Sequence, residues 1–551
     1  MNGLSNCADL HSKIANCFFE IVFYTQFLMT KWSHSVTRVR SMLLAFFVAL
    51  PAGQTPIRFA HSLGSHMVLQ QAPKRAIVWG FCDPSTCASV QVTLVRFSEP
   101  SASQTMSATL GADAGTFVAK LPATAGSDTP YAVVVTDGST RATITDVLFG
   151  DVWVCSGQSN MAFLLQNMFN GSTYVNNSAQ YTTLRMMTSY KTDSKTPLDE
   201  QPKVEEVWSV SSPEAVSMDL GSGVGDDNWL YMSAVCYLFG LEVLQQTGKP
   251  VGLVNTNWGG THVEYWMSPD ANAQCKDALV PAGENGAWNG MIKPLLNMTI
   301  KGAIWYQGEA NTGDPFTEVD SQGLAMMSYG CHFPAMISDW RSKWSKGTSG
   351  ETDAEFPFGY AQLAAWINFP NTAALRWSQS AGFPSVPNAR MPNVFSSIGI
   401  DLLDRTSPYG SVHIRDKVAV GHRLAAGARA TVYGNTSTYW GGPYVSSATS
   451  TSSATTVTFT NVGAEGIEVR NASGWEVCTG GGATTCAPNA TGSWAFANVT
   501  ASSTHTVTLD APSSVVRYAW GGAPFEYKAA GVYARAEDYP AGGFVVAVAA
   551  E

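Results

Sequence analysis

The chain is poor in charged residues and lacks long runs of either basic or apolar residues. Only 13% of its 551 residues are charged, the formal net charge is −10, and Lys and Arg form no cluster. Neither nucleic acid nor an anionic membrane is therefore an expected partner. The CxxC and HxxxH spacings of zinc sites are also missing, so no metal site is expected. The hydrophobic content of 45% is typical of a globular protein with a large core.

The first 53 residues are interpreted as a leader. Arg38 and Arg40 precede an apolar segment at 42–50, and small residues follow at 51–53. This order is typical of a secretory signal peptide, and the apolar segment is too short to span a membrane. The residues before Met29 fit this pattern poorly, which indicates an over-long gene model. A signal anchor is the alternative.

Sequons and cysteines also favour the secretory pathway, with an extracellular or lysosomal destination. After the leader the number of cysteines is even, and Cys82/Cys87 and Cys478/Cys486 lie close enough in sequence for local disulfides. Glycosylation sequons mark surface loops of secreted proteins. They occur at Asn170, Asn176, Asn297, Asn435, Asn471, Asn489 and Asn498.

Three regions of different pattern follow the leader. Residues 54–145 contain short β-strand patterns separated by turn residues, which favours a small β-sandwich. Residues 146–434 alternate between strand and helix patterns, which predicts a mostly parallel sheet covered on both faces. Residues 435–551 are rich in Ser, Thr and Gly with alternating β-formers, which indicates a second β module. Helices are predicted over 232–244, 333–344 and 415–433.

The segment 150–161 carries the strongest functional signal. Residues 152–155 read as a buried strand, Gly157 permits a sharp turn, and a helix is predicted over 159–169. Ser159, between strand and helix, therefore places its hydroxyl at the carboxyl edge of the sheet, where open α/β sheets bind ligands. Taken by itself, Ser159 is better explained as a helix N-cap.

Four strand-end loops are predicted to meet at this edge, at 156–160, 257–262, 307–311 and the loop that reaches His413. Acyl transfer needs a nucleophile, a base and oxyanion donors, and these loops contain all three kinds of group. The candidate donors are the N–H of Ser159, the N–H of Gly259 or Gly260, and the Asn311 amide. His413 is the expected base because it follows a strand and precedes a helix, with His262 as its rival.

Six segments carry a specific pattern: FAHSLGSHMVLQQAP, GDVWVCSGQSNM, NTNWGGTHVEYW, AIWYQGEAN, DLLDRTSPYGSVHIRDK and RYAWGGAPFEYK. Together they resemble the sialate O-acetylesterase family, a branch of the SGNH hydrolases. The resemblance covers roughly residues 58–528 and implies a three-layer flavodoxin-like α/β domain flanked by β modules. It also implies removal of acetyl groups from sugar hydroxyls without a metal or organic cofactor. It assigns Ser159 as nucleophile, His413 as base, and Gly260 and Asn311 to the oxyanion hole.

One position departs from the wider SGNH pattern. Many of those enzymes carry Asp three residues before the catalytic His, where this chain has Gly410. Asp401 and Asp404 are then the candidate acid partners, unless a backbone carbonyl holds the imidazole. Asp401 is equally explained as the residue that closes a strand, and Asp404 as the partner of a nearby basic side chain. Ile414 also replaces the Pro that usually follows this His.

Substrate contacts are predicted for four further residues. Trp266 is a candidate for stacking on a sugar, although an aromatic ring at a strand end is commonly part of the core. Gln158, Gln307 and Glu309 are polar enough to fix either the loops or the sugar, and Glu309 fits a loop-fixing role better than that of a catalytic acid.

The leading hypothesis is a serine esterase that acts on an O-acetyl ester in a small molecule or glycan. O-acetylated sialic acid is the preferred substrate, and another acetylated glycan is the alternative. Gly410 and the β modules motivate a second hypothesis, a carbohydrate-binding protein without turnover. A peptidase would need a polypeptide cleft that the sequence does not indicate.

Overall fold

The computed structural model describes residues 56–550 except 86, 113–114, 218–228, 276–284, 368, 370, 481–484, 489 and 491–492. The predicted leader and the sequon at Asn489 lie outside the described residues. In the described part of the chain, no helix is long and apolar enough to cross a membrane. The same residues contain no group of three or more His, Cys, Asp or Glu side chains arranged to hold a metal ion.

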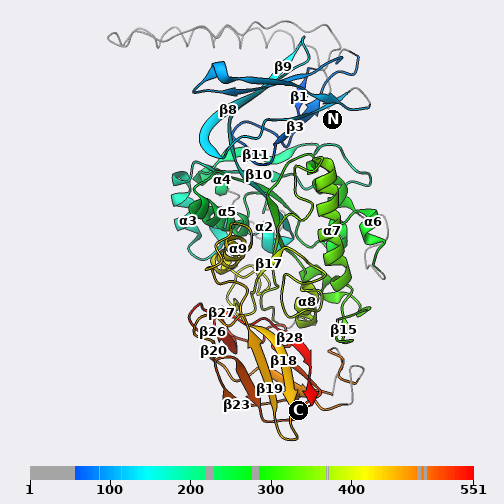
Figure 1. The fold of residues 1–551 in the computed structure, drawn as a ribbon, viewed down its shortest axis with the longest axis vertical. Helices are drawn as coiled ribbons and strands as arrows, with labels where there is room; N and C mark the ends of the chain where they lie inside the picture. Colours follow the sequence, from blue (N-terminus) through cyan, green and yellow to red (C-terminus); the bar gives the residue numbers. More distant parts are fainter. Residues whose placement is uncertain are drawn as a thin grey trace, which may run out of the picture. The chain divides into compact units, whose positions relative to one another are not determined.

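A mostly parallel sheet forms the centre of the α/β region, as the alternation of strand and helix patterns predicts (Figure 1). Its parallel strands lie in the order β10-β12-β9-β13-β16-β17, and β11 pairs antiparallel with β10 at one edge. In chain order this reads 2-3-1-4-5-6, whereas flavodoxin has 2-1-3-4-5. The bounds are β9 Arg141–Gly157, β10 Leu184–Ser189, β11 Val204–Val210, β12 Val251–Asn257, β13 Gly302–Tyr306, β16 Phe358–Ala361 and β17 Val394–Ser397.

Strand β9 is common to the N-terminal β region and the central sheet. Its first half pairs with β8 (Ser127–Thr136) and β2 (Val68–Gln70), and its second half lies between β12 and β13. The boundary predicted between residues 145 and 146 therefore falls inside one continuous strand of 17 residues. The chain leaves β9 to form β10 and β12 on one side, then crosses to β13 on the other. Such a switch point opens a crevice at the carboxyl end of the central strand.

Helices cover both faces of the central sheet (Figure 1). On one face, Phe239 of α5 meets Trp153 of β9 with ring centroids 4.9 Å apart. On the other, Trp340 of α7 meets Trp305 of β13 at 5.8 Å. The bounds are α3 Gly171–Asn177, α4 Pro213–Val216, α5 Ala234–Thr247, α6 Pro269–Asn272, α7 Tyr329–Gly347, α8 Thr372–Gln379 and α9 Lys417–Thr431.

The helix predicted over 159–169 is wrong in length. Helix α2 spans only Ser159–Ala162, and a 3₁₀ turn follows at Leu165–Asn167. Phe163 and Leu164 are extended between them, and Leu164 bridges to Ser233. Apolar side chains in this segment are buried on several sides at once, so their density in the sequence did not indicate one helical face.

The N-terminal region is β-rich, as predicted. One sheet has the order β1-β3-β7-β6, and β4, β5 and β8 connect to the central sheet through β9. Their bounds are β1 Arg58–Phe59, β3 Ile77–Phe81, β4 Gln91–Arg96, β5 Gln104–Ser107, β6 Thr109–Leu110 and β7 Thr116–Lys120.

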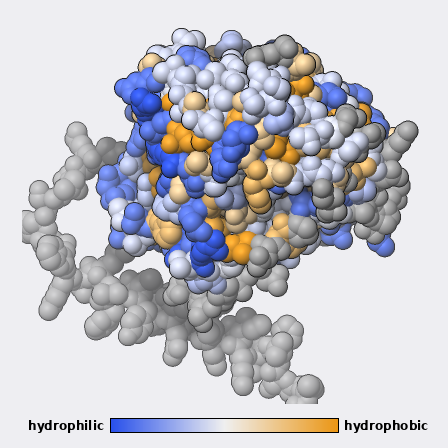
Figure 2. Space-filling view, turned by 90° about the horizontal axis from the view of Figure 1, so that it is seen from below, coloured by the Kyte–Doolittle hydropathy of each residue, from blue (hydrophilic) through white to orange (hydrophobic). Residues whose placement is uncertain are grey.

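The C-terminal region is also β-rich and has its own core around Trp475, Tyr518 and Val457. On the face seen from below Figure 1, polar and apolar residues are interspersed (Figure 2). The strands are β18 Tyr444–Ser450, β19 Thr455–Thr460, β20 Ile467–Val469, β21 Trp475–Cys478, β22 Ala495–Phe496, β23 Val499–Ser502, β24 Thr506–Leu509, β25 Val515–Tyr518, β26 Val532–Ala534, β27 Tyr539–Pro540, β28 Phe544–Ala547 and β29 Ala549–Ala550. A small hairpin of the α/β region, β14 (Glu318–Val319) and β15 (Ala325–Met326), precedes α7.

A buried arginine joins the C-terminal region to the α/β region. Arg376 of α8 is fully buried and donates to the carbonyls of Gly521 and Gly522 at 2.8 and 2.7 Å. It also donates to the carbonyls of Leu363 and Ala364 in the α/β region, both at 2.8 Å. These acceptors satisfy a buried charge that has no carboxylate partner in the described part of the chain, which is how a buried guanidinium is tolerated.

Four disulfides link the eight cysteines of the described region. The two local bridges predicted from sequence, Cys82–Cys87 and Cys478–Cys486, are present. Cys155–Cys236 ties the end of β9 to α5, and Cys275–Cys331 ties the segment after α6 to α7. Four disulfides fit a protein that folds in an oxidising compartment.

Candidate active site

Ser159 lies at the sharp turn between β9 and α2. Gly157 has a φ of 139°, and a Cβ at this position would lie 2.1 Å from the Tyr306 carbonyl oxygen of the neighbouring strand. Only glycine fits this close approach of two backbones. Gln158 follows in extended conformation, and Ser159 opens the helix and lines a cavity.

His413 reaches Ser159 from the loop after β17. Its Nε2 lies 2.8 Å from Ser159 Oγ, and its Nδ1 lies 2.7 Å from the Tyr409 carbonyl oxygen. A carbonyl oxygen only accepts hydrogen bonds, so Nδ1 carries the proton and Nε2 is left to accept from the serine hydroxyl. His262, the rival base, lines the same cavity, but no hydrogen bond joins it to Ser159 among the described contacts.

The turn that presents His413 explains the glycine found where many SGNH enzymes have aspartate. Gly410 has a φ of 83°, in the left-handed region, and its carbonyl accepts from the His413 N–H at 3.0 Å. Ser407 Oγ donates to the His413 carbonyl at 2.6 Å. The loop is thus folded tightly enough for the Tyr409 carbonyl to approach the imidazole.

The prediction that Asp401 or Asp404 orients His413 is not supported by their positions. Asp404 accepts from Nε and one terminal nitrogen of Arg415 at 2.7 and 2.8 Å. Asp401 is buried and forms a two-point ion pair with Arg423 at 2.7 and 2.9 Å. Each carboxylate is held by its own arginine, and the orienting acceptor is the backbone carbonyl of Tyr409.

Burial is the main cause that lowers the pKa of His413 to about 4, and the nearby positive charge of Lys417 adds to it. The hydrogen bond to the Tyr409 carbonyl acts in the opposite direction. The imidazole is therefore neutral at neutral and mildly acidic pH. A neutral imidazole is the form that acts as a general base.

Asn160, directly after the serine, ties three parts of the site together. Its Nδ2 donates to Glu309 Oε1 and to the Val412 carbonyl, and its Oδ1 accepts from the Nζ of Lys417. Lys417 is fully buried between the rings of Phe163 and Tyr306, and burial lowers its pKa to about 7. Sequence reasoning missed both residues, and for Lys417 no signal in the pattern indicated complete burial.

The cavity beside Ser159 has a volume of about 610 Å³. Of the predicted oxyanion residues, Ser159 and Gly260 line it. The first N–H groups of a helix have no intrahelical acceptor, so the amide at the start of α2 is suited to this role. Gly260 has a φ of 72°, and its backbone is exposed to the cavity.

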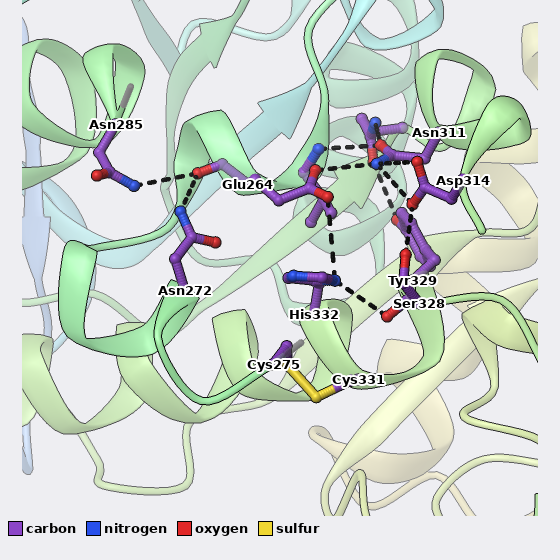
Figure 3. Close-up of polar contacts among 12 residues, drawn as sticks. Glu264, Asn272, Cys275, Asn285, Asn311, Asp314, Ser328, Tyr329, Cys331 and His332 are labelled. Carbon is purple, nitrogen blue, oxygen red and sulfur yellow. Dashed lines mark hydrogen bonds and ion pairs between the residues drawn. A yellow bond between two sulfur atoms is a disulfide. The ribbon is translucent and has the colours of Figure 1, made fainter. Parts of the chain in front are cut away.

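Asn311 does not line the cavity, contrary to its predicted oxyanion role. It is fully buried, and both ends of its amide are engaged (Figure 3). Its Oδ1 accepts from the Val263 N–H at 3.0 Å and from Gln307 Nε2 at 2.7 Å. Its Nδ2 donates to Glu264 at 2.9 Å and to Asp314 at 3.1 Å. Asn311 therefore joins the loop after β12 to the loop after β13, outside the cavity wall.

Two buried carboxylates share that amide (Figure 3). Burial and the adjacent charge of Glu264 raise the pKa of Asp314 to about 7. Buried His332 lies behind them, with its Nδ1 3.0 Å from the Ser328 carbonyl and 3.9 Å from Glu264 Oε1. This network supports the loops that carry the cavity wall, because its members lie on both of them and on α7.

Two of the four predicted substrate contacts are not in the cavity wall. Trp266 is fully buried, donates to Thr261 Oγ1 and meets Trp305 at 5.9 Å, so it belongs to the core. Gln307 is fully buried and donates to the Thr261 carbonyl and to Asn311. Gln158 and Glu309 do line the cavity.

Aromatic residues that the sequence reasoning missed form another part of the wall. Trp366 and Phe369 stack with ring centroids 3.5 Å apart and an interplanar angle of 7°. Both follow β16, a fifth strand end whose loop carries aromatic residues instead of a Gly-rich polar pattern. Thr312, Asn371 and Val412 also line the cavity.

Comparisons with known proteins agree with one another. Residues 149–347 match the family model described as carbohydrate esterase, sialic acid-specific acetylesterase. Residues 445–548 match that of the sialate O-acetylesterase C-terminal domain. Sialate O-acetylesterases from mouse and human are each 34% identical over 89% of this chain, which corresponds to 94% and 92% of those proteins. The crystal structure of a carbohydrate acetylesterase from Xanthomonas citri superposes with a TM-score of 0.69 at 26% identity, covering 89% of this chain and 99% of that one.

Proposed function

Because the chain belongs to the sialate O-acetylesterase family, and is therefore a carboxylic ester hydrolase, we propose that it removes O-acetyl groups from sugars by acyl transfer through Ser159 and His413. The observation that carries the proposal is the 2.8 Å contact between Ser159 Oγ and His413 Nε2, two residues that line the cavity. A neutral imidazole whose other nitrogen is fixed by a carbonyl is ready to accept the serine proton.

The reaction proceeds in two halves. Ser159 Oγ attacks the acetyl carbonyl carbon while His413 Nε2 takes the hydroxyl proton, and the N–H groups of Ser159 and Gly260 receive the negative oxygen. The tetrahedral intermediate collapses, and the sugar oxygen leaves with the proton from His413. A water molecule then attacks the acetyl-serine, again giving its proton to His413. Acetate leaves, and the proton returns to Ser159.

The Tyr409 carbonyl takes the place of the usual carboxylate partner. It fixes the tautomer and direction of the imidazole, which is the positioning part of the acid's role. It carries no full charge, so it stabilises the imidazolium less than an aspartate would. In this proposal the α/β region is a three-layer domain of the SGNH type, in which β12 is inserted between the first two parallel strands.

O-acetylated sialic acid is the proposed substrate, and another acetylated glycan is the alternative. A cavity of about 610 Å³ exceeds what an acetyl group needs and is of the size that holds a whole small ligand. The four disulfides support an extracellular or lysosomal destination. The carbohydrate-binding alternative loses its main support, since the Tyr409 carbonyl accounts for the glycine at 410.

The test is acetate release from an aryl acetate and from 9-O-acetyl sialic acid, with Ser159→Ala and His413→Ala beside the wild type. Turnover of both substrates that disappears in both variants is expected. Turnover of the aryl acetate alone would retain the mechanism and direct the search to other acetylated glycans. No turnover of either, with glycan binding intact, would refute the esterase.

A further inference from the structure

A second cleft of about 310 Å³ adjoins the proposed active-site cavity. Phe369 and Asn371 line both spaces, so these two residues form their common boundary. The Asn371 Nδ2 also donates to the carbonyl of Thr312, which lines the first cavity. The far side of the second cleft comes from the C-terminal β region, through Arg517, Trp520 and Pro488.

The two sides of this cleft are held in a fixed relation. The Trp366 N–H donates to the Gly522 carbonyl at 2.9 Å, and Arg376 donates to the carbonyls of Gly521 and Gly522. A Cβ on Gly522 would lie 2.5 Å from the Trp366 carbonyl oxygen, so the two chains are in close backbone contact. The C-terminal region therefore contributes a built wall, held by backbone contacts.

The side chains of the cleft suit a sugar ring. Phe369 is 38% exposed and is supported from behind by the stacked ring of Trp366. Trp520 is partly exposed, and its Nε1 donates to the Pro488 carbonyl at 3.1 Å. Aromatic rings with a few polar groups between them form the usual lining of small-molecule sites, and the apolar C–H face of a pyranose packs well on such rings.

Arg517 supplies the polar end of the cleft. It pairs with Glu476 at 2.7 and 3.0 Å and donates to the Pro488 carbonyl at 2.8 Å. Its guanidinium carbon lies 4.1 Å from the centroid of the Trp494 ring. Five N–H donors exceed these three contacts, so the group retains donors for the hydroxyls of a ligand. Because the positive charge of Arg517 is already paired with Glu476, the cleft favours a neutral ligand over an anion.

We propose that this second cleft binds the sugar that follows the acetylated one, so that the preferred substrate is an acetylated residue within a glycan chain. The inference rests on the proposed function and specifies its substrate class. The first cavity holds the acetylated sugar at Ser159, and the next sugar lies between Phe369 and Trp520. The C-terminal β region is thus part of the substrate site.

The kinetic test compares substrates of different length in the full-length protein. The pairs are 9-O-acetyl sialic acid with 9-O-acetylated sialyllactose, and acetylated xylose with acetylated xylotriose. With the wild type, the longer member of the active pair is expected to have the lower KM. In Trp520→Ala, the ratio of kcat/KM on the longer substrate to that on an aryl acetate should fall by about 5- to 10-fold. Phe97→Ala is the control, because Phe97 is an aromatic residue that is 50% exposed and lies directly after β4 in the N-terminal β region, outside the lining of the cleft.

A binding test separates this inference from the esterase proposal. In Ser159→Ala, calorimetric titration with unacetylated sialyllactose and with xylotriose requires no turnover. Binding of one of them that Trp520→Ala weakens and Phe97→Ala does not would support the cleft even if no ester were hydrolysed. Equal effects of the two substitutions, or a wild type whose KM is the same for short and long substrates, would overturn the subsite while leaving the aryl acetate activity as evidence for the esterase.

Discussion

Replacement of Asp404 by asparagine distinguishes a carbonyl-held histidine from a Ser-His-Asp triad. In a triad, loss of the carboxylate that holds the histidine lowers kcat by about 10⁴-fold. In this site Asp404 binds the backbone N–H, Nε and a terminal nitrogen of Arg415, and the Tyr409 carbonyl contacts His413. The substitution should therefore act only by loosening the loop between residues 404 and 413.

The expected magnitudes follow from this geometry. The Asp404 side chain is 5% exposed and that of Arg415 is 22% exposed, so the pair is partly screened by solvent. Asp404→Asn should lower the free energy of unfolding by about 1–2 kcal/mol. If a similar loss of about 1.4 kcal/mol were expressed fully in the activation free energy, kcat would fall by about 10-fold, which is the upper limit expected.

The assay is aryl acetate hydrolysis at saturating substrate, with a thermal melt of each variant. His413→Ala is the reference for complete loss of the base. Asp401→Asn is the stability control, because it breaks a buried pair with Arg423 and should cost about 3–5 kcal/mol. A fall in kcat of about 10³-fold or more in Asp404→Asn, with the melting temperature nearly unchanged, would show that Asp404 serves the histidine and that the reasoning from Tyr409 is wrong.

Three further predictions concern pH and stability. Because the base must be neutral and the pKa of His413 is about 4, kcat/KM should fall only as the pH approaches 4. Lys417→Met removes a nearby positive charge, so it should raise the pKa of His413 and move this fall to higher pH. An unchanged pH profile would contradict the electrostatic effect of Lys417 on His413. The pKa of Asp314 is raised from 3.8 to about 7, so its protonated form stabilises the fold fully below pH 3.8. This contribution is lost as the pH rises through 7. The melting temperature should therefore decline between these pH values, and decline less in Asp314→Asn. Replacing Cys155 and Cys236 by alanine removes a disulfide that joins residues 81 positions apart. The free energy of unfolding measured in urea should fall by about 4 kcal/mol, and a fall below about 1 kcal/mol would contradict this prediction.

The positions of the strand ends could be predicted from the sequence because they depend on local pattern. A run of consecutive apolar residues followed by Gly157 predicts a buried strand and a sharp turn, and the structure has both. The loops around Ser159, Gly260 and His413 then meet because parallel strands end at one edge. The same reasoning predicted too long a helix at 159–169. Residues that are buried on every side show no helical spacing of apolar and polar side chains, so the sequence did not indicate where the helix ends.

The direction of each polar side chain was not predictable in the same way. Asn311 and Gln307 lie in a loop at the carboxyl edge of the sheet, as predicted. They nevertheless face the loop after β12 and helix α7, and not the cavity. Spacing along a loop does not state which side of it faces solvent. The orienting group for His413 was equally hidden, because a backbone carbonyl such as that of Tyr409 has no signature in the side-chain pattern.

The buried guanidinium of Arg376 has a consequence for how this molecule can be divided. A shortened protein that stops near residue 434 would retain the arginine but lose the carbonyls of Gly521 and Gly522 that accept two of its hydrogen bonds. Unsatisfied donors of a buried cation carry a heavy solvation penalty. In the shortened protein water can take the place of those carbonyls at the uncovered surface. When recombination exchanges the C-terminal region, the arginine is buried again, so the exchange succeeds only when the donor sequence presents two carbonyls at the same place.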